Sequence, residues 1–297
     1  MLSRVPATPI VVGGAVRWTG HAGTASGTVS VRRGTPLTGM NADELHEALR
    51  DAYEVSLPAF EPPGRFERRD GYDLLCAPSV PVAELNGVWP NDEAATLAAI
   101  DEVRRELVDA GSPFALQLRA GSTDAFRDEL ERRGLRETHR NDGMLVRRRE
   151  LVEPRRTDAE VEVEVVTDDA TLEIFVRTAA AGFGSSLEHN AAQFTPRLRR
   201  LPGESVILVR AAGEPVSTAA CLVRGDAVGI FGVATPPQVR GRGYGSLATW
   251  RACAIGFEAG ARFAYLQSSA LGNPVYRGLG FRTVETYSWW ELPEPRS

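Results

Sequence analysis

The sequence predicts an α/β (α+β) protein built from two tandem domains, in each of which strands alternate with amphipathic helices. Its length of 297 residues exceeds the usual size of one small domain and suits two. Hydrophobic residues make up 43% of the chain and charged residues 25%, which is typical of a globular protein that buries substantial cores. A charged segment containing Pro154 separates the two runs of strand and helix patterns.

We expect four segments along the chain. Residues 1–40 are rich in Gly, Ser, Thr, Ala and Val and form either a β-hairpin or a loose arm, whose role stays open. Residues 41–150 form the first domain, residues 151–158 the linker, and residues 159–297 the second domain.

The first domain is expected to begin with a helix capped by Asn41, with Leu45 and Leu49 on its apolar face. The segment 58–71 is rich in Pro and Gly. Beyond it we expect helices at 91–110 and 123–133 and strands at 114–118 and 144–146.

The second domain is expected to begin with a half-buried strand at 160–166, where Glu and Val alternate. Asp168 or Asp169 caps a helix that extends to Ala181, and a further helix is expected at 187–201. Three strands at hairpin spacing follow, and after them a helix, a strand, a helix and two final strands; the three strands are expected at 205–211, 215–223 and 228–234.

Charge and hydropathy exclude several classes of protein. The formal net charge is −5, so the chain lacks the positive excess with which proteins neutralise nucleic-acid phosphates. No apolar stretch approaches the length of a membrane span, and the short apolar run 9–16 makes a poor signal peptide because Arg17 and Trp18 follow it. We therefore expect neither nucleic acid nor a membrane as a partner.

The three cysteines, Cys76, Cys221 and Cys253, lie far apart and form no Cys-x-x-Cys motif. They predict neither a disulfide framework nor a zinc site, and we expect no metal. A chain without disulfides suits a reducing compartment, so a cytoplasmic location is the simplest expectation.

A glycine-rich turn after the strand at 228–234 is expected to carry the chemistry. It contains Gly241, Gly243 and Gly245 and opens a helix. Glycines let the backbone approach a phosphate closely, and the free N–H groups and dipole of the first helical turn attract an anion. Arg240 and Arg242 add positive charge. The spacing fits no dinucleotide fingerprint, and a Walker A loop needs a lysine, which the chain lacks.

This turn resembles a motif of a known family. Arg240-x-x-Gly243-x-Gly245 is similar to motif A of the GNAT N-acetyltransferases, and the strand before it ends in Val-x-x-Pro, as is usual in that family. The resemblance extends over residues 157–292.

A second match lies downstream, where segment 273–281 resembles motif B of the same family. Asn273, Tyr276, Gly280 and Phe281 stand at the matching positions, and a helix and a strand separate the two motifs, as the family requires. Two motifs in order are much more specific than a glycine-rich turn alone.

The resemblance implies an acyltransferase that moves an acetyl group from acetyl-CoA to a primary amine, directly within a ternary complex. Tyr276 is implied as the general acid that protonates the departing thiolate, which suits a phenol because its ordinary pKa is near that of a thiol. The positions implied to bind acetyl-CoA are Val233, Ala234, Thr235, Arg240, Gly241, Arg242, Gly243, Tyr244, Gly245, Ser246, Asn273 and Tyr276.

The general base is less clearly marked. Many family members carry a glutamate on the strand before motif A, whereas segment 229–233 of this chain contains no carboxylate. Glu188 is the candidate we favour, with His189 and Asp226 as alternatives, and each is also compatible with a solvated surface role. A water chain oriented by Ser268 and Ser269 is equally consistent with the sequence.

The sequence of the first half resembles that of the second half. Segment 111–117 parallels segment 260–267, and in both halves a long helix precedes it and a short helix ending in glycine follows it. Segment 86–90, which precedes the long helix of the first half, has no glycine series and no arginine. We therefore expect two tandem GNAT-like domains, each a mixed, mostly antiparallel sheet flanked by helices. The first lacks the CoA loop and either walls the acceptor pocket or packs as a pseudo-partner of the second.

Two alternatives to amine acetylation stay open. One is transfer of another acyl group, and the other is a non-catalytic sensor that binds CoA or a small ligand with the same fold. The expected acceptor is a small-molecule or peptide amine, and the protein is expected to be a monomer or a homodimer.

Overall fold

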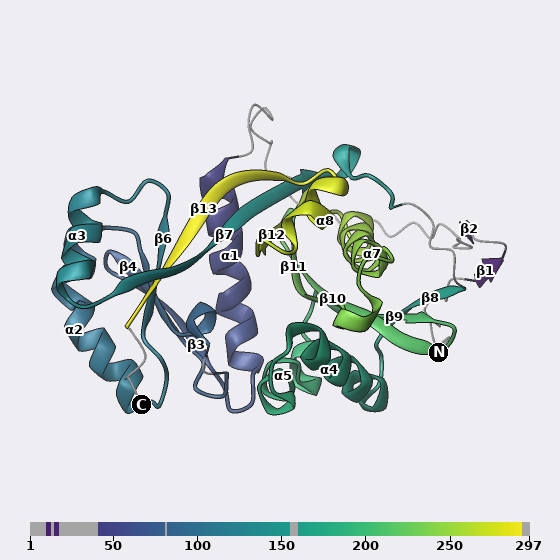
Figure 1. Ribbon diagram of the computed structural model, residues 1–297, viewed down its shortest axis with the longest axis horizontal. Coiled ribbons are helices and arrows are strands. Elements are labelled where there is room, and N and C mark those ends of the chain that lie inside the picture. Colours follow the sequence, from purple (N-terminus) through teal and green to yellow (C-terminus); the bar gives the residue numbers. More distant parts are fainter. Residues whose placement is uncertain (1–9, 13–14, 18–40, 81, 155–159, 293–297) are drawn as a thin grey trace, which may run out of the picture. The chain divides into compact units, whose positions relative to one another are not determined.

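The computed structural model describes residues 10–12, 15–17, 41–80, 82–154 and 160–292 (Figure 1). The chain divides into two compact units, residues 1–40 and residues 41–297. In the first unit, β1 (Ile10–Val12) pairs antiparallel with β2 (Ala15–Arg17). Of the two forms considered for this segment, the described residues adopt the hairpin.

The second unit contains a single mixed sheet of eleven strands. Their order across the sheet is β3-β4-β5-β6-β13-β7-β12-β11-β10-β9-β8. Two pairs, β5/β6 and β11/β12, are parallel, and the others are antiparallel. The strands are β3 (Arg65–Arg69), β4 (Tyr72–Cys76), β5 (Gly87–Pro90), β6 (Ala115–Arg119), β7 (Arg136–Arg147), β8 (Val161–Val165), β9 (Glu204–Ala211), β10 (Glu214–Arg224), β11 (Ala227–Ala234), β12 (Phe263–Ser268) and β13 (Arg282–Glu291).

Two helices, α1 and α4, begin at capping residues that the sequence predicts, Asn41 and Asp168. Asn41 forms a complete capping box with Glu44, and the side chains of Thr123 and Asp168 cap α3 and α4. The helices are α1 (Ala42–Ser56), α2 (Glu93–Asp109), α3 (Asp124–Arg132), α4 (Asp169–Phe183), α5 (Leu187–Gln193), α6 (Pro196–Arg199), α7 (Tyr244–Glu258) and α8 (Asn273–Gly278).

The expected helix at 187–201 is two helices instead of one. Thr195 caps α6 by accepting a hydrogen bond from the N–H of Leu198 at 3.0 Å. Pro196 occupies the first position of α6, where its missing N–H is harmless, but its ring is incompatible with a continued α5. The chain therefore turns between the two helices.

The two halves exchange their last strands, which was not predicted from the sequence. β13 ends the second half but lies between β6 and β7, and β7 ends the first half but lies between β13 and β12. We predicted two final strands after α8. The described residues contain one, β13, and β7 takes the place of the other beside β12. Figure 1 shows these two long strands side by side at the junction of the halves.

Trp290 illustrates the consequence for stability. It lies on β13 yet is 4% exposed in the core of the first half, among Leu116 and Leu130. We expect Trp290→Ala to lower the free energy of unfolding by about 3–5 kcal/mol, because it leaves a large cavity. Urea unfolding followed by circular dichroism should show one transition at a lower midpoint.

The matched control for that variant is Leu271→Ala, since Leu271 is 69% exposed. It should leave the urea midpoint nearly unchanged. Two separate transitions in Trp290→Ala, with the second half unaffected, would contradict the view that the exchanged strands couple the halves.

The helices cover both faces of the second half's sheet. Ile207 and Cys221 pack with α7 on one face, whereas Val206 and Ala220, the alternate residues of the same strands, pack with α4 on the other. Helix α1 lies on the α4 face, across the junction of the halves, and contacts β3, β7, β10, β11 and β13.

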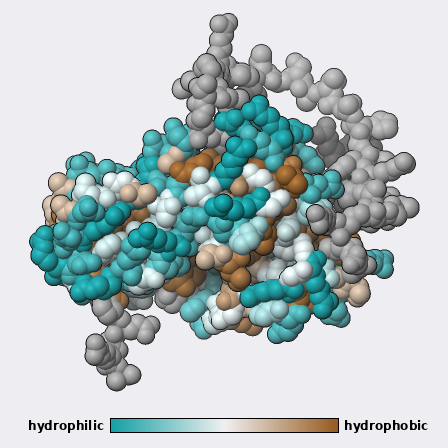
Figure 2. All heavy atoms as spheres, turned by 45° about the horizontal axis from the view of Figure 1, so that its top comes forward, coloured by the Kyte–Doolittle hydropathy of each residue, from teal (hydrophilic) through white to brown (hydrophobic). Residues whose placement is uncertain are grey.

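None of the helices in the described residues is long and apolar enough to cross a membrane. Large hydrophobic side chains that are exposed lie on separate elements, and on the face seen in Figure 2 the hydrophobic areas interrupt a mostly hydrophilic surface. Isolated exposed apolar residues are usual in globular proteins.

Candidate active site

A gap opens between the parallel strands β11 and β12. Their pairing runs from Ala227 opposite Phe263 to Gly229 opposite Tyr265 and stops there, although β11 continues to Ala234. Beyond Gly229 the strands diverge, and the backbone of β11 faces the gap with no ladder partner on β12. Unpaired strand edges bind extended chains by adding hydrogen bonds.

A bulge in β11 shapes the wall of this gap. Gly232 has a φ of +59°, and the register with β10 shifts between Thr218 and Ala220. The Thr218 hydroxyl donates to the Gly232 carbonyl at 2.8 Å, which holds the bulge. A Cβ at Gly232 would lie 2.8 Å from the ring of Phe194, so only glycine fits both the backbone and the packing there.

The glycine-rich turn joins the end of β11 to the start of α7. Gly243 is the N-cap of α7 with a φ of +83°, and no side chain caps the helix. Gly241 has a φ of +78°, and a Cβ built on it would meet nothing within 4 Å, so the turn is open to a ligand. The first turn of α7 contains no acidic residue. The uncapped N–H groups and the helix dipole therefore form an anion-binding site beside the gap.

Arg240 supports this turn from behind. Its Nε donates to the Thr235 carbonyl at 2.9 Å and its Nη2 to the Gly182 carbonyl at 2.7 Å. These bonds tie the turn to the ends of β11 and α4, so the Arg240 guanidinium positions the loop. Arg242 is exposed at the turn. Tyr244 is buried in the core beneath α7, which leaves its backbone as the part that faces the loop.

The end of β11 is held by short side-chain bonds. The Ser217 hydroxyl lies 2.9 Å from the Ala234 carbonyl and 2.9 Å from the Thr235 hydroxyl. A Cβ on Gly182 would lie 2.7 Å from the Cβ of Ala234, so α4 packs directly against the strand end. The structure thus brings the predicted segment 233–235 and the turn together at one edge of the gap.

Tyr276 lies on α8, is 8% exposed, and packs in the same core as the buried face of α7. Its ring makes an edge contact with Phe281 at 6.0 Å between centroids. Burial raises the pKa of Tyr276 to about 12, so its phenol stays protonated throughout the usual pH range. It is therefore a hydrogen-bond donor rather than a strong acid.

The side chain of Asn273 makes hydrogen bonds to other residues of the protein. Its Nδ2 donates to the Asp142 carboxylate at 2.6 Å, and its Oδ1 accepts from Arg277 Nε at 2.6 Å. Asp142 belongs to β7, so Asn273 ties α8 to the strand received from the first half. The side chain anchors α8, and its predicted contact with the cofactor remains a prediction.

The three candidates for a base lie on α5 and in a separate turn, and Ser268, the candidate for orienting a water, is buried. Glu188 is exposed in the first turn of α5, and His189 follows it with partial exposure. Asp226 pairs with Arg262 at 3.1 Å in the turn between β10 and β11, far along the strand from the gap's open end. The Ser268 hydroxyl donates to the Ser269 carbonyl at 2.8 Å. The structure also contains a pocket on the α4 face of the sheet, and none of these residues lines it.

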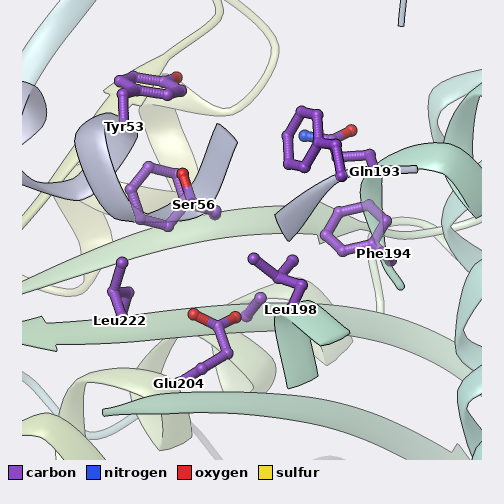
Figure 3. A pocket seen from close by; sticks show the side chains of 10 residues that line it. Tyr53, Ser56, Gln193, Phe194, Leu198, Glu204 and Leu222 are labelled. Carbon is purple, nitrogen blue, oxygen red and sulfur yellow. The ribbon is translucent and has the colours of Figure 1, made fainter. Parts of the chain in front are cut away.

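That pocket on the α4 face was not predicted from the sequence. In Figure 3 the Glu204 carboxylate points into the space between Leu222 and Leu198, below Ser56. Desolvation raises the pKa of Glu204 well above its ordinary range, although the residue as a whole is only half-buried. The lining residues are Tyr53, Ser56, Phe60, Gln193, Phe194, Leu198, Glu204, Ala220, Leu222 and Phe231.

The first half contains the corresponding parallel pair but not the anion site. Its pairing also ends early, after Val88 opposite Leu116. Here, however, the Asp92 side chain caps α2 by accepting from the N–H of Ala95 at 2.8 Å, and Glu93 lies in the first turn. A carboxylate already occupies the helix N-terminus, which disfavours a phosphate there.

The comparisons with known proteins agree with this architecture. Residues 169–281 match the Acetyltransferase (GNAT) family. None of the curated proteins matches the sequence. This match places a GNAT domain, the fold of acyltransferases, at residues 169–281, and the uncapped turn before α7 lies within it.

Solved structures extend the likeness to most of the chain. A GCN5-related N-acetyltransferase from Kribbella flavida is 20% identical, with a TM-score of 0.65 over 83% of this chain and 96% of that one. One from Sphaerobacter thermophilus is 16% identical, with a TM-score of 0.57 over 82% and 84%. A tandem GNAT protein from the clavulanic acid biosynthesis pathway is 13% identical, with a TM-score of 0.52 over 86% and 97%. At these identities the likeness concerns the fold, and it confirms the predicted tandem arrangement.

Proposed function

We propose that this protein is an N-acetyltransferase that moves an acetyl group from acetyl-CoA to a primary amine. The observation that carries the proposal is the coincidence of two features at the end of β11. The strand diverges from β12 after Gly229, and the uncapped N-terminus of α7 opens at the same edge. An extended chain with a pyrophosphate at one end suits both features.

The residues present fit acetyl-CoA. The backbone of 241–246 would hold the pyrophosphate, with Arg242 available at the surface of the turn and Arg240 bracing it. The backbone edge of 233–235, which has no partner on β12, would pair with the pantetheine arm. Acetyl-CoA supplies an activated thioester when bound. Among the described residues no cluster of three His, Cys, Asp or Glu side chains could hold a metal ion.

The reaction is proposed to be direct transfer. The amine nitrogen gives up a proton to the base and attacks the thioester carbonyl; the C–N bond forms, the C–S bond breaks, and the sulfur leaves as a thiolate that takes a proton from water. Tyr276 is proposed to donate a hydrogen bond to that sulfur. Its pKa of about 12 lies above that of a thiol, so this donation stabilises the departing sulfur without requiring the phenol to ionise.

The cysteines favour direct transfer over an acyl-cysteine. Cys221 and Cys253 are fully buried, and burial raises the pKa of both thiols. A protonated, inaccessible thiol is a poor nucleophile. The base is proposed to be Glu188 acting through water, since its side chain is exposed on α5.

Titration calorimetry with acetyl-CoA tests the proposal first. We expect saturable binding with a Kd in the micromolar range, followed by thiol release when amines are added. Binding without thiol release for any amine would support a CoA-binding sensor instead, and an absence of binding would contradict both.

A further inference from the structure

The pocket on the α4 face has the chemistry of a cation site. Aromatic rings of Tyr53, Phe60, Phe194 and Phe231 contribute to its walls, and Glu204 supplies the one carboxylate among the lining residues. No arginine lines it, so the carboxylate has no counter-charge from the pocket wall. Desolvation raises the pKa of Glu204 because it disfavours the ionised carboxylate, and an ammonium group beside Glu204 would favour that ionised form. Aromatic faces and an enclosed carboxylate together favour an organic ammonium group.

The pocket lies near the gap but is displaced from it. Phe231 stands on β11, two residues past the point at which β12 separates, and so links the pocket to the gap. Glu204 begins β9, and β10 lies between β9 and β11. Two interstrand spacings correspond to roughly 10 Å. An ammonium at Glu204 is therefore too far away to be the nitrogen that attacks a thioester in the gap.

We propose that this pocket binds a second, non-reacting ammonium group of the acceptor, so that the preferred acceptors are diamines. The inference rests on the proposed acetyl transfer. It assigns Glu204 as the residue that holds the distal ammonium and the aromatic rings as the walls that exclude water from it. The reacting nitrogen would then lie on the order of 10 Å away, beside the gap.

The same geometry gives the first half a role. Tyr53 and Ser56 on α1, and Phe60 just after it, close one side of the pocket, whereas Glu204 and Phe231 come from the second half. The Tyr265 hydroxyl donates to the Ala48 carbonyl at 2.7 Å, which fixes α1 over β12. A half without its own phosphate site thus forms the wall of an acceptor pocket.

A matched pair of acceptors tests the proposal. Heptylamine and 1,7-diaminoheptane have the same carbon chain and differ in the second ammonium. We expect kcat/KM for the diamine to exceed that for the monoamine at least about tenfold in the unmodified protein, since a buried charged contact is of that size. In Glu204→Gln the preference should disappear while the Kd of acetyl-CoA stays unchanged.

Two further variants make the result specific. Glu214→Gln removes an exposed carboxylate at the start of β10 and should keep the diamine preference. Ser56→Phe fills the pocket from α1 without altering Glu204 and should lower kcat/KM for the diamine, leaving acetyl-CoA binding intact. Equal rates for both amines in the unmodified protein, or a preference that survives Glu204→Gln, would overturn the proposal.

Calorimetry of 1,7-diaminoheptane alone separates this inference from the proposed function. If the protein binds the diamine, loses this binding in Glu204→Gln and does not bind acetyl-CoA, the cation pocket is supported and the proposed transferase activity is contradicted. If the protein turns over acetyl-CoA with monoamines but shows no diamine binding that depends on Glu204, the transferase activity is supported and the cation pocket is contradicted.

Discussion

The Gly243→Asp variant is expected to bind acetyl-CoA at least about 100-fold more weakly than the unmodified protein. Gly243 is the uncapped N-cap of α7 at a φ of +83°. An aspartate there places a carboxylate among the free N–H groups, where it repels and replaces the pyrophosphate. Titration calorimetry measures the loss directly.

Gly260→Asp provides the control, because Gly260 follows the other end of the same helix at a φ of +105°, and a Cβ added there would meet nothing within 4 Å. Both substitutions strain a left-handed backbone by about 1–3 kcal/mol. Gly260→Asp should therefore lower the melting temperature but keep acetyl-CoA binding. An equal loss of binding in both variants would attribute the effect to misfolding and remove the support for the anion site.

The Tyr276→Phe variant is expected to lower kcat about 100-fold or more while the Kd of acetyl-CoA stays within about twofold. The phenol hydroxyl is proposed to donate to the sulfur only as the C–S bond breaks, so its removal affects the transition state and not binding. Because burial raises the pKa of Tyr276 to about 12, its ionisation should cause no fall in rate below about pH 10 in the unmodified protein.

Tyr287→Phe is the matched control for this experiment. Tyr287 is fully buried on β13, and its hydroxyl has no hydrogen-bond partner within the described part of the chain. Removing that hydroxyl should leave both kcat and stability close to those of the unmodified protein. A kcat for Tyr276→Phe equal to that of Tyr287→Phe would exclude the proposed role of the Tyr276 hydroxyl.

Several elements could be predicted because their causes are local. The caps at Asn41 and Asp168 bond to the backbone two or three residues ahead, so a short stretch of sequence contains both partners. The turn before α7 needs glycine at two left-handed positions, Gly241 and Gly243, and the sequence supplies both.

Other elements escaped prediction because their residues do not show the usual alternation. β3 (Arg65–Arg69) carries four charged residues in five and lies at the sheet edge, where Arg69 pairs with Glu106 at 2.9 Å. Charged side chains are common on edge strands and hide the period of two. β7 begins at Arg136, well before the predicted start at 144. Its first residues are polar and so show no hydrophobic pattern, and it is their pairing with β13 that makes them part of the sheet.

The glycine-rich turn, motif A, motif B and the tandem repeat could all be located from the amino-acid sequence, since each depends on residues close together in the chain. The exchange of β7 and β13 between the halves became visible only in the folded chain, because strand pairing joins residues far apart in sequence. The same holds for Glu204, a charged residue that is expected at the surface until α1 and Phe231 remove its carboxylate from water. Desolvation depends on every neighbour at once, which no local pattern encodes.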